Sequence, residues 1–243
     1  SEMCIETGGY PYGLYNADKG TTEAVNYNNE GLYRRNLLTS GINIRYNGPH
    51  ISFNSQTSYQ YIQDKMGIDQ DFSPRNIFYG QNKIRQHMYC QEFTVKSVNK
   101  SRYHWITGAF VFRQTINRKV DLSRFTDTTR HLTNSGIPTQ GIAFYHQSTL
   151  DLLQGLSCSV GLRYDYEHAR CDFSKVQQPL NGNGETKSLE QFNRSLHFGQ
   201  FTPRFSMQYL SSHNQLFYAS VSKGYKAGGF NVSFLNNDDY LYS

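Results

Sequence analysis

The chain has 243 residues, of which 37% are hydrophobic and 15% aromatic, including 19 Tyr and 16 Phe. Its mean hydropathy of -0.66 is too low for membrane helices, and no apolar run approaches the roughly 20 residues that a spanning helix needs. The net charge is +5, but Lys and Arg are scattered, so nucleic-acid binding is not expected. A membrane β-barrel passes these tests, because only alternate residues of its strands face lipid.

The first half of the chain becomes regular after an irregular start. Residues 1–34 are rich in Gly, Tyr and Asn, and we expect them to form no long element. Apolar and polar residues begin to alternate at Leu37, and a second alternating run extends from Ile51 to Tyr61. A third lies around residues 89–96. This period of two predicts β-strands with one apolar and one polar face.

The second half continues the pattern. A fourth strand is predicted over residues 103–114, with Ile106, Phe110 and Phe112 on one face and Thr107 and Arg113 on the other. A fifth follows over residues 140–150. The sixth, residues 156–167, has the clearest alternation. Two extended runs, residues 201–209 and 216–226, surround a short polar turn and predict a closing β-hairpin.

The connections between these strands alternate in length. Short turns fall near residues 47, 99, 152 and 212, whereas long polar segments cover about residues 64–86, 115–138 and 170–193. Outer-membrane barrels have short periplasmic turns and longer extracellular loops. The sequence therefore predicts an all-β fold, an antiparallel up-and-down meander of about eight long strands that is part of a transmembrane β-barrel. A soluble β-sandwich is the alternative, although its loops need not alternate in length.

The closing hairpin also carries a family resemblance. Thr202-Pro203-Arg204-Phe205 and the whole stretch from Leu216 to Asn231 resemble a barrel hairpin of TonB-dependent outer-membrane receptors. Weaker similarity follows in the family's order at residues 55–59, 91–93, 105–109 and 161–164. The resemblance covers residues 35–231, which we expect to be transmembrane strands and extracellular loops. Residues 232–243 are expected to begin a further loop or strand.

The resemblance implies a receptor in the outer membrane of a Gram-negative bacterium. Such receptors bind a scarce solute, most often a ferric siderophore, and admit it when the TonB complex pulls on an N-terminal plug. Neither a plug nor a TonB box is recognisable in this sequence, and plugged transporters have about 22 strands. We therefore expect the chain to be part of a receptor barrel, with binding and transport as its function.

Two other functions remain open at this stage. One is a small self-contained outer-membrane barrel of eight to ten strands, acting as a passive pore or a structural protein. The other is a soluble all-β carbohydrate-binding module that uses the many Tyr residues.

Candidate ligand-facing residues lie on the polar faces of the strands, near the long loops. There they would line the lumen wall that an incoming ligand passes, and Arg side chains can make bidentate bonds to carboxylate or catecholate-type oxygens. Alternatively, these charges pair with one another. The candidates are Gln60, Arg113, Arg163, Asp165, Glu167 and Arg204.

A second candidate group lies in the segment from Asn117 to His131, which we expect to be an extracellular loop. Its excess of positive charge would steer an anionic ferric complex or contact lipopolysaccharide phosphates. An ordinary solvated loop is the alternative. The basic residues are Arg118, Lys119, Arg124 and Arg130, against Asp121 and Asp127.

No catalytic, metal or cofactor site is predicted. The four Cys residues lack the spacing of a zinc site. Asp69 and Asp71 are not followed by the remaining ligands of a calcium loop. The letters S-x-x-K occur at Ser220 to Lys223, but in a strand, whereas a nucleophile of that class begins a helix.

Overall fold

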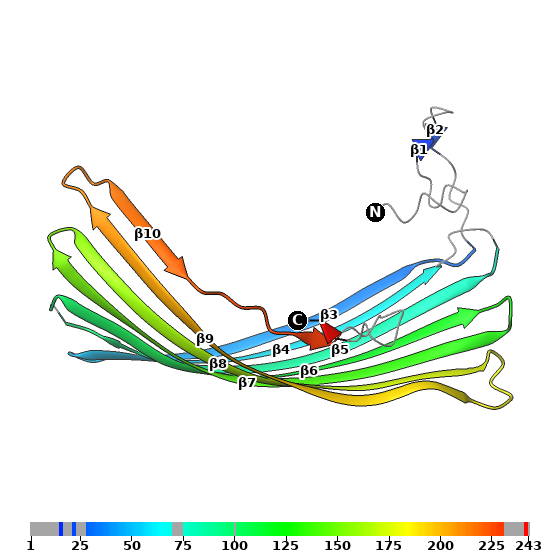
Figure 1. Ribbon diagram of the computed structural model, residues 1–243. Coiled ribbons are helices and arrows are strands. Elements are labelled where there is room, and N and C mark those ends of the chain that lie inside the picture. Colours follow the sequence, from blue (N-terminus) through cyan, green and yellow to red (C-terminus); the bar gives the residue numbers. More distant parts are fainter. Residues whose placement is uncertain are drawn as a thin grey trace.

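Eight long strands form one antiparallel sheet in which every neighbour in space is a neighbour in sequence (Figure 1). The computed structural model describes residues 28–69, 75–99 and 101–230, and the backbone of residues 15–16, 21–22 and 241–242. The long strands are β3 (Leu32–Asn47), β4 (Ile51–Asp69), β5 (Phe78–Ser97), β6 (Tyr103–Arg124), β7 (Thr129–Leu153), β8 (Leu156–Pro179), β9 (Lys187–Leu210) and β10 (Leu216–Ser222). The predicted eight-stranded meander is confirmed.

Two very short hairpins accompany the sheet. They pair β1 (Tyr15–Asn16) with β2 (Thr21–Thr22) and β11 (Gly229–Phe230) with β12 (Leu241–Tyr242). Most of the predicted segments 1–34 and 232–243 lies outside the described residues. Among the described residues there is no helix that is long and apolar enough to cross a bilayer.

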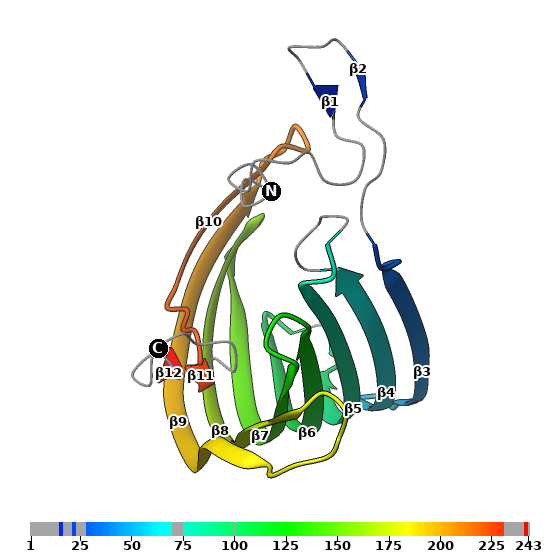
Figure 2. The same ribbon diagram turned by 90° about the vertical axis from the view of Figure 1, so that its right-hand side faces the viewer.

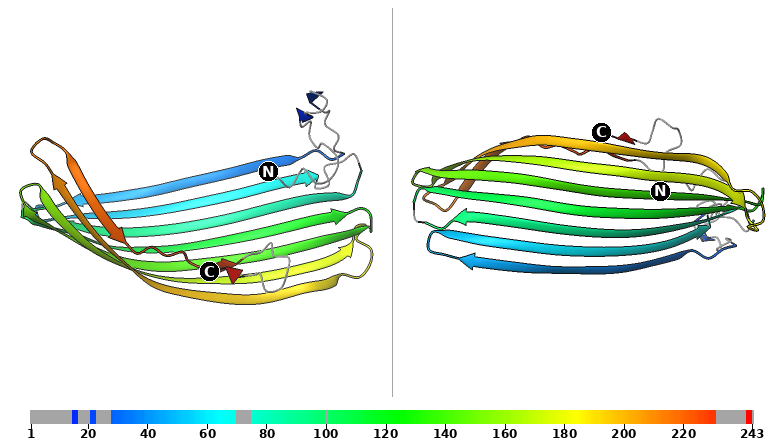
Figure 3. Two further views of the ribbon diagram at one scale, coloured as in Figure 1. Left: turned by 45° about the horizontal axis from the view of Figure 1, so that its top comes forward. Right: turned by 90° about the horizontal axis from the view of Figure 1, so that it is seen from below.

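The sheet is bent into a trough (Figures 1 and 2). Its strands run side by side along the trough, as the view from below shows (Figure 3). In the described part of the chain, β3 and β10 are the two edges and do not pair with each other. The eight strands therefore form a section of a curved wall rather than a closed barrel.

The two faces of this wall differ in burial and in chemistry. Bending crowds the side chains on the concave face, so that the most buried strand residues gather there, among them Ser52, Ala143 and Ser157. On β8 the concave face carries Arg163, Asp165 and Glu167, at odd positions. Cross-strand partners share a face, so the ladders assign concave and convex positions on each of the other strands as well. The concave face is the polar lumen face that the alternation predicted.

The convex face carries a continuous apolar band. On β8 it extends from Leu156 to Tyr166, a span of 11 residues, which agrees with the ~9–11 residues of a tilted membrane strand. Its side chains are unusually exposed, for example Phe144 at 55% and Val160 at 57%. Outer-membrane β-barrels carry an apolar band of this kind on the outward face of their strands.

The band crosses the strands obliquely. On β9 its lower edge is Tyr209, and on β3 it is Tyr46. The path of cross-strand partners that starts at Tyr46 on β3 crosses each strand from β4 to β8 and ends at Pro203 on β9. Pro203 is six residues from Tyr209. A shift of six residues over six strand steps, at ~3.3 Å per residue and ~4.8 Å per step, corresponds to a strand tilt of about 35°. Outer-membrane barrels have this tilt.

Polar side chains inside the apolar band bind one another. The Tyr103 hydroxyl lies 2.9 Å from the Ser148 hydroxyl, and the His146 ring lies between Ser148, at 3.0 Å, and Thr107, at 2.6 Å. Because lipid offers no hydrogen bonds, such groups are tolerated when they are paired with protein groups. This chain of contacts explains how polar residues occupy the centre of a lipid-facing surface.

The long polar segments are strands for most of their length, which corrects the prediction of loops. β6 continues to Arg124 and β7 begins at Thr129, so the segment of residues 115–138 turns within four residues. Likewise β8 and β9 extend to Pro179 and from Lys187. Beyond the apolar band both faces of a strand meet water, so the alternation that reveals a strand in a sequence disappears. The strands nevertheless remain paired as hairpins beyond the apolar band.

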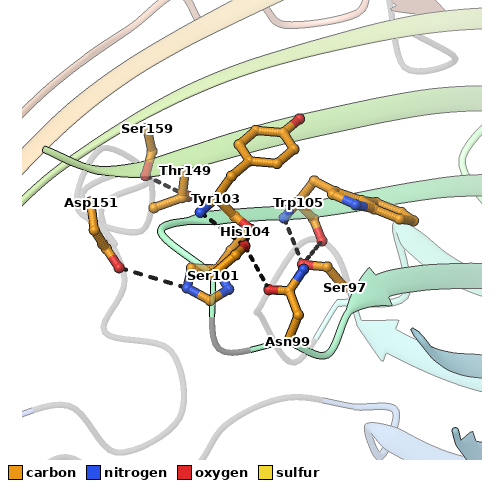
Figure 4. Close-up of polar contacts among 9 residues, drawn as sticks. All are labelled: Ser97, Asn99, Ser101, Tyr103, His104, Trp105, Thr149, Asp151 and Ser159. Atoms are coloured by element: carbon orange, nitrogen blue, oxygen red, sulfur yellow. Dashed lines mark hydrogen bonds and ion pairs between the residues drawn. The ribbon is translucent and has the colours of Figure 1, made fainter. Parts of the chain in front are cut away.

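Side chains fix the short turns at the opposite end of the sheet (Figure 4). Between β5 and β6, the Ser97 hydroxyl accepts a hydrogen bond from the Trp105 N–H at 2.9 Å, and the Ser101 hydroxyl accepts one from the Tyr103 N–H at 3.2 Å. The side chains of His104 and Asp151 join this turn to β7 at 3.7 Å.

The chain leaves the sheet after β10. Pro203 has no N–H to continue a ladder, and β10 ends opposite Arg204. The N–H of Lys223 still donates to the Pro203 carbonyl at 3.0 Å. Further on, Phe230 packs against the concave side of β8, where Ala169, Cys171 and Phe173 form an apolar cluster with it.

Candidate functional site

A hollow on the concave face collects charged residues from several strands. Its volume is about 350 Å³. Side chains of opposite charge line it, including Glu92 from β5, Arg163 from β8, Arg204 from β9 and Lys223 just after β10. Tyr145 from β7 lies between them. Because these strands are neighbours in the meander and the sheet is bent, residues more than 100 positions apart border the same hollow.

Arg163 is held by its neighbour on the same strand. Its Nε lies 2.9 Å and 2.8 Å from the two carboxylate oxygens of Asp165, and its Nη2 lies 2.6 Å from Oδ1. Residues two apart share a face of a strand. For this pair the alternative foreseen from the sequence, mutual pairing of the lumen charges, describes the structure.

Arg204 and Lys223 differ from Arg163 in this respect. Neither forms an ion pair with a carboxylate in the part of the chain that the structure describes. Both line the hollow. Arg204 lies on the concave face of β9, and Lys223 borders the same hollow where the chain leaves β10, so both can offer donors to a ligand there.

Tyr145 fixes the floor of the hollow. Its hydroxyl donates to the Glu92 carboxylate at 2.8 Å and lies 2.9 Å from the Thr94 hydroxyl. The ring crosses Gly108 of β6, where a Cβ atom would lie 2.3 Å from the Tyr145 hydroxyl oxygen. The absence of a side chain at Gly108 therefore allows the ring to lie flat along the wall.

We expect Gly108→Ala to destabilise the protein by about 2 kcal/mol, the usual scale of overpacking. The added methyl group forces Tyr145 away from Glu92 and Thr94. Gly161→Ala is the matched control on the same face, because its Cβ would meet no atom closer than 3.6 Å. Urea unfolding of the membrane-inserted protein measures both changes. Equal destabilisation by the two variants would contradict the role of Tyr145.

The lumen candidates are distributed unevenly. Arg163, Asp165 and Glu167 follow one another on the concave face of β8, and Arg204 lies on the same face of β9. Gln60 is also concave but belongs to β4, four strands from β8. It is not part of the hollow. A role in ligand binding remains a prediction for these five residues.

Arg113 lies on the opposite face, which corrects its predicted position. Its cross-strand partners are Tyr89 and Gln140, and it shares the convex side of β6 with Val111. The prediction took the Phe residues of β6 as the lipid face. Phe110 and Phe112 are concave instead, and the Phe112 ring lies 2.5 Å from where a Cβ of Gly141 would be. β6 is apolar on both faces, so polarity could not identify its outward side.

The four basic residues of the predicted loop separate in the same way. Arg130 is bound through two of its nitrogens to the Asp121 carboxylate, and Arg124 lies 3.2 Å from Asp127 at the hairpin tip. Arg118 is on the concave face and donates to Asn82 at 3.2 Å. Lys119 points to the convex side, opposite Lys83. They form no common steering surface.

Comparison with known proteins agrees with this geometry. A family model described as TonB dependent receptor-like, beta-barrel matches residues 5–242. The chain belongs to this family. The match begins well before residue 35, where the resemblance seen in the sequence started. TonB-dependent receptors are receptors and transporters rather than enzymes, in agreement with the sequence prediction.

A solved structure supports the fold of the receptor barrel. The chain is similar to the crystal structure of the ferric yersiniabactin uptake receptor FyuA from Yersinia pestis, with a TM-score of 0.70 and 14% sequence identity. The similarity covers 82% of this chain and 30% of the FyuA chain. The chain thus spans less than a third of the length of that receptor.

Beyond the apolar band, local contacts tune several ionisable groups of the receptor barrel. At the β6–β7 tip the Thr129 hydroxyl, which donates to Asp127 at 2.7 Å, lowers the pKa of that carboxyl, and Arg124 acts in the same direction. Burial raises the pKa of the Cys171 thiol to about 11. A thiol that is protonated at neutral pH and fully buried is a packing group rather than a nucleophile.

The described residues contain no group of three or more His, Cys, Asp or Glu side chains that could hold a metal ion. Asp69 has a structural role, because its carboxylate accepts hydrogen bonds from the backbone N–H groups of Asn28 and Asn29 at 3.2 Å and 3.4 Å. Asp71 lies outside the described residues.

Three residues of the hollow were missed by reasoning from the sequence. Lys223 lies in the stretch that carries the family resemblance, but nothing in that stretch separates it from the other polar residues there. Glu92 and Tyr145 are far apart in sequence, and only the ladders from β5 to β7 reveal that they meet. The signal for Tyr145 is Gly108 directly opposite on β6, and that pairing depends on the register.

Proposed function

We propose that the protein containing this chain is a TonB-dependent outer-membrane receptor that binds and takes up a ferric siderophore. The observation that carries this proposal is the pair Arg204 and Lys223, two cations without carboxylate partners among the described residues, in one hollow of the lumen wall. Ferric siderophores present carboxylate or catecholate-type oxygens. Arg and Lys bind such anionic oxygens by charge-assisted hydrogen bonds.

Partners follow from the same proposal. Family membership supports contact of the whole receptor with the TonB complex. The apolar band supports a location in the outer membrane, with the lengthened hairpins outside. FyuA, by its description a ferric yersiniabactin uptake receptor, supports an iron chelate as the first ligand to test.

The structure offers less support for the alternatives. A self-contained barrel of eight strands requires pairing between β3 and β10, and the described strands do not pair there. A soluble carbohydrate-binding module would expose the apolar band to water. Neither alternative explains the presence of the two cations, Arg204 and Lys223, at the hollow.

Ligand binding by the purified full-length receptor tests the proposal. We expect Arg204→Gln and Lys223→Gln each to weaken binding of a ferric chelate about tenfold, the scale of one charge-assisted hydrogen bond. Arg45→Gln is the matched control, because Arg45 is exposed on the concave face of β3, far from the hollow.

Isothermal titration with ferric and iron-free chelates measures these affinities. A tenfold loss confined to the two hollow variants supports the proposed site. Unchanged affinity in both variants would remove the hollow from the binding path. A wild-type receptor that binds none of a panel of ferric siderophores would overturn the proposed function itself.

A further inference from the structure

Four cations lie directly opposite one another on the convex face. Arg34 of β3 pairs with Lys65 of β4, Lys65 pairs with Lys83 of β5, and Lys83 pairs with Lys119 of β6. All four side chains are exposed. Directly opposed side chains have Cβ atoms ~4.5–5.5 Å apart, so this cation row places four positive charges side by side across four strands.

No carboxylate compensates the cation row. Among the described residues, the carboxylates on the convex faces of β3 to β6 are Asp69 and Asp121. Asp69 is fully buried and accepts from backbone N–H groups, and Asp121 is bound by Arg130. Like charges directly opposite one another destabilise a sheet. The row repeats this cost three times, and a bound anion would relieve it.

The position of the cation row identifies the kind of anion. On β3 and β4 it lies four residues beyond the last apolar side chains of the band, Leu38 and Tyr61, about 13 Å along the strand. It lies toward the lengthened hairpins, the extracellular side of outer-membrane barrels. The row therefore faces the headgroups of the outer leaflet rather than the lumen or the acyl chains.

The surface at the row is hollowed. A hollow of about 470 Å³ is lined by Lys65, Lys83 and Lys119 of the row, together with Arg85 and the amides of Gln63 and Asn117. All six side chains belong to the convex face. Asp64 and Ile84 also border the hollow, but both belong to the concave face, where the Asp64 carboxylate is paired with Arg35. Amide N–H groups beside several cations are the donors that phosphate oxygens accept from.

We propose that the cation row binds the phosphate groups of an outer-leaflet lipid, a phosphorylated glycolipid whose acyl chains cover the apolar band below. Each phosphate carries negative charge and several acceptor oxygens, so one headgroup can neutralise two or more of the opposed cations. The site is separate from the lumen hollow, because the two lie on opposite faces of the sheet. It anchors the receptor in its membrane and takes no part in ligand passage.

The test compares two triple variants of the full-length receptor in neutral detergent. One replaces Lys65, Lys83 and Lys119 by Gln. The control replaces Arg45, Lys96 and Arg102 by Gln, which removes the same charge at the opposite end of the strands. Binding of purified lipopolysaccharide to the immobilised receptors is measured with its phosphates intact and after enzymatic dephosphorylation. Circular dichroism establishes that each variant is folded.

We expect the cation-row variant to bind lipopolysaccharide at least tenfold more weakly than wild type and the control variant to bind it normally. Each Lys or Arg near an anionic lipid surface contributes about a fivefold factor in binding. Dephosphorylated lipid should bind all three proteins weakly. Retained binding by the cation-row variant, or equal binding of dephosphorylated lipid by wild type, would overturn the proposal. Displacement of the lipid by micromolar inorganic phosphate would also overturn it and indicate a site for soluble phosphate.

Discussion

Val160→Arg will destabilise the receptor barrel by about 2–4 kcal/mol, the cost of an Arg side chain at the bilayer midplane on the lipid face of a barrel. Val160 lies near the middle of the apolar band of β8, on the convex face, and is 57% exposed. Its cross-strand partners are Ser148 and Phe205. The guanidinium group would have to leave water for lipid, and neither partner is an acid that could pair with it.

Ser174→Arg is the control for this prediction. Ser174 lies on the same strand and the same face, opposite Asn134 and Gln191, but beyond the band. There an Arg should cost no more than about 1 kcal/mol, the value for positions near the interface. Urea titration of the full-length protein folded into lipid vesicles gives both free energies of unfolding. Equal values for the two variants would show that the convex band does not face lipid.

Gly155→Ala should cost about 3 kcal/mol of stability. Gly155 lies in the turn between β7 and β8 with a φ of 80°, a conformation that costs an L-residue about 1–2 kcal/mol. A Cβ atom there would lie 2.3 Å from the backbone oxygen of Leu210 on β9. Leu210 cannot move away freely, because its N–H donates to the Gly155 carbonyl at 2.7 Å. The clash therefore adds overpacking of roughly 1–3 kcal/mol.

A substitution at Gly182 separates the conformational cost of a positive φ from the cost of overpacking. Its φ of 74° is similar, but a Cβ atom there would meet nothing within 4 Å. Gly182→Ala should therefore cost only the conformational part, about 1–2 kcal/mol. The two variants are compared by the same urea titration in vesicles. A cost at Gly182 as large as that at Gly155 would mean that the contact with β9 contributes nothing.

The strands within the apolar band, and the polarity of most of their faces, can be predicted from the alternation of residues alone. On β8, the residues from Leu156 to Tyr166 alternate without a break, as expected for a barrel wall with lipid on one side and water on the other. That difference in solvent between the two faces produces the period of two in the sequence. The short turns were equally visible, since each contains the Gly, Asn or Ser residues that reverse a chain.

Alternation fails as a guide where both faces of a strand meet the same surroundings, and there the strand pairing is needed. Above the band both faces of a strand are wet, so the hairpin of β6 and β7 looked like a loop. On β6 both faces are apolar, so only the pairing of Arg113 with Tyr89 and Gln140 shows that this residue lies on the convex face. Register is fixed by hydrogen bonds between strands, and a shift of one residue exchanges the two faces.

The two candidate sites depend on register in the same way. Arg204 and Lys223 belong to one hairpin and could be associated from the sequence, but their meeting with Glu92 and Tyr145 requires the bend of five successive strands. The cation row is spread over 86 positions, from Arg34 to Lys119, and each member looks like an ordinary solvated residue. Only the ladders place these charges opposite one another, because side chains that are distant along the chain become neighbours when their strands pair.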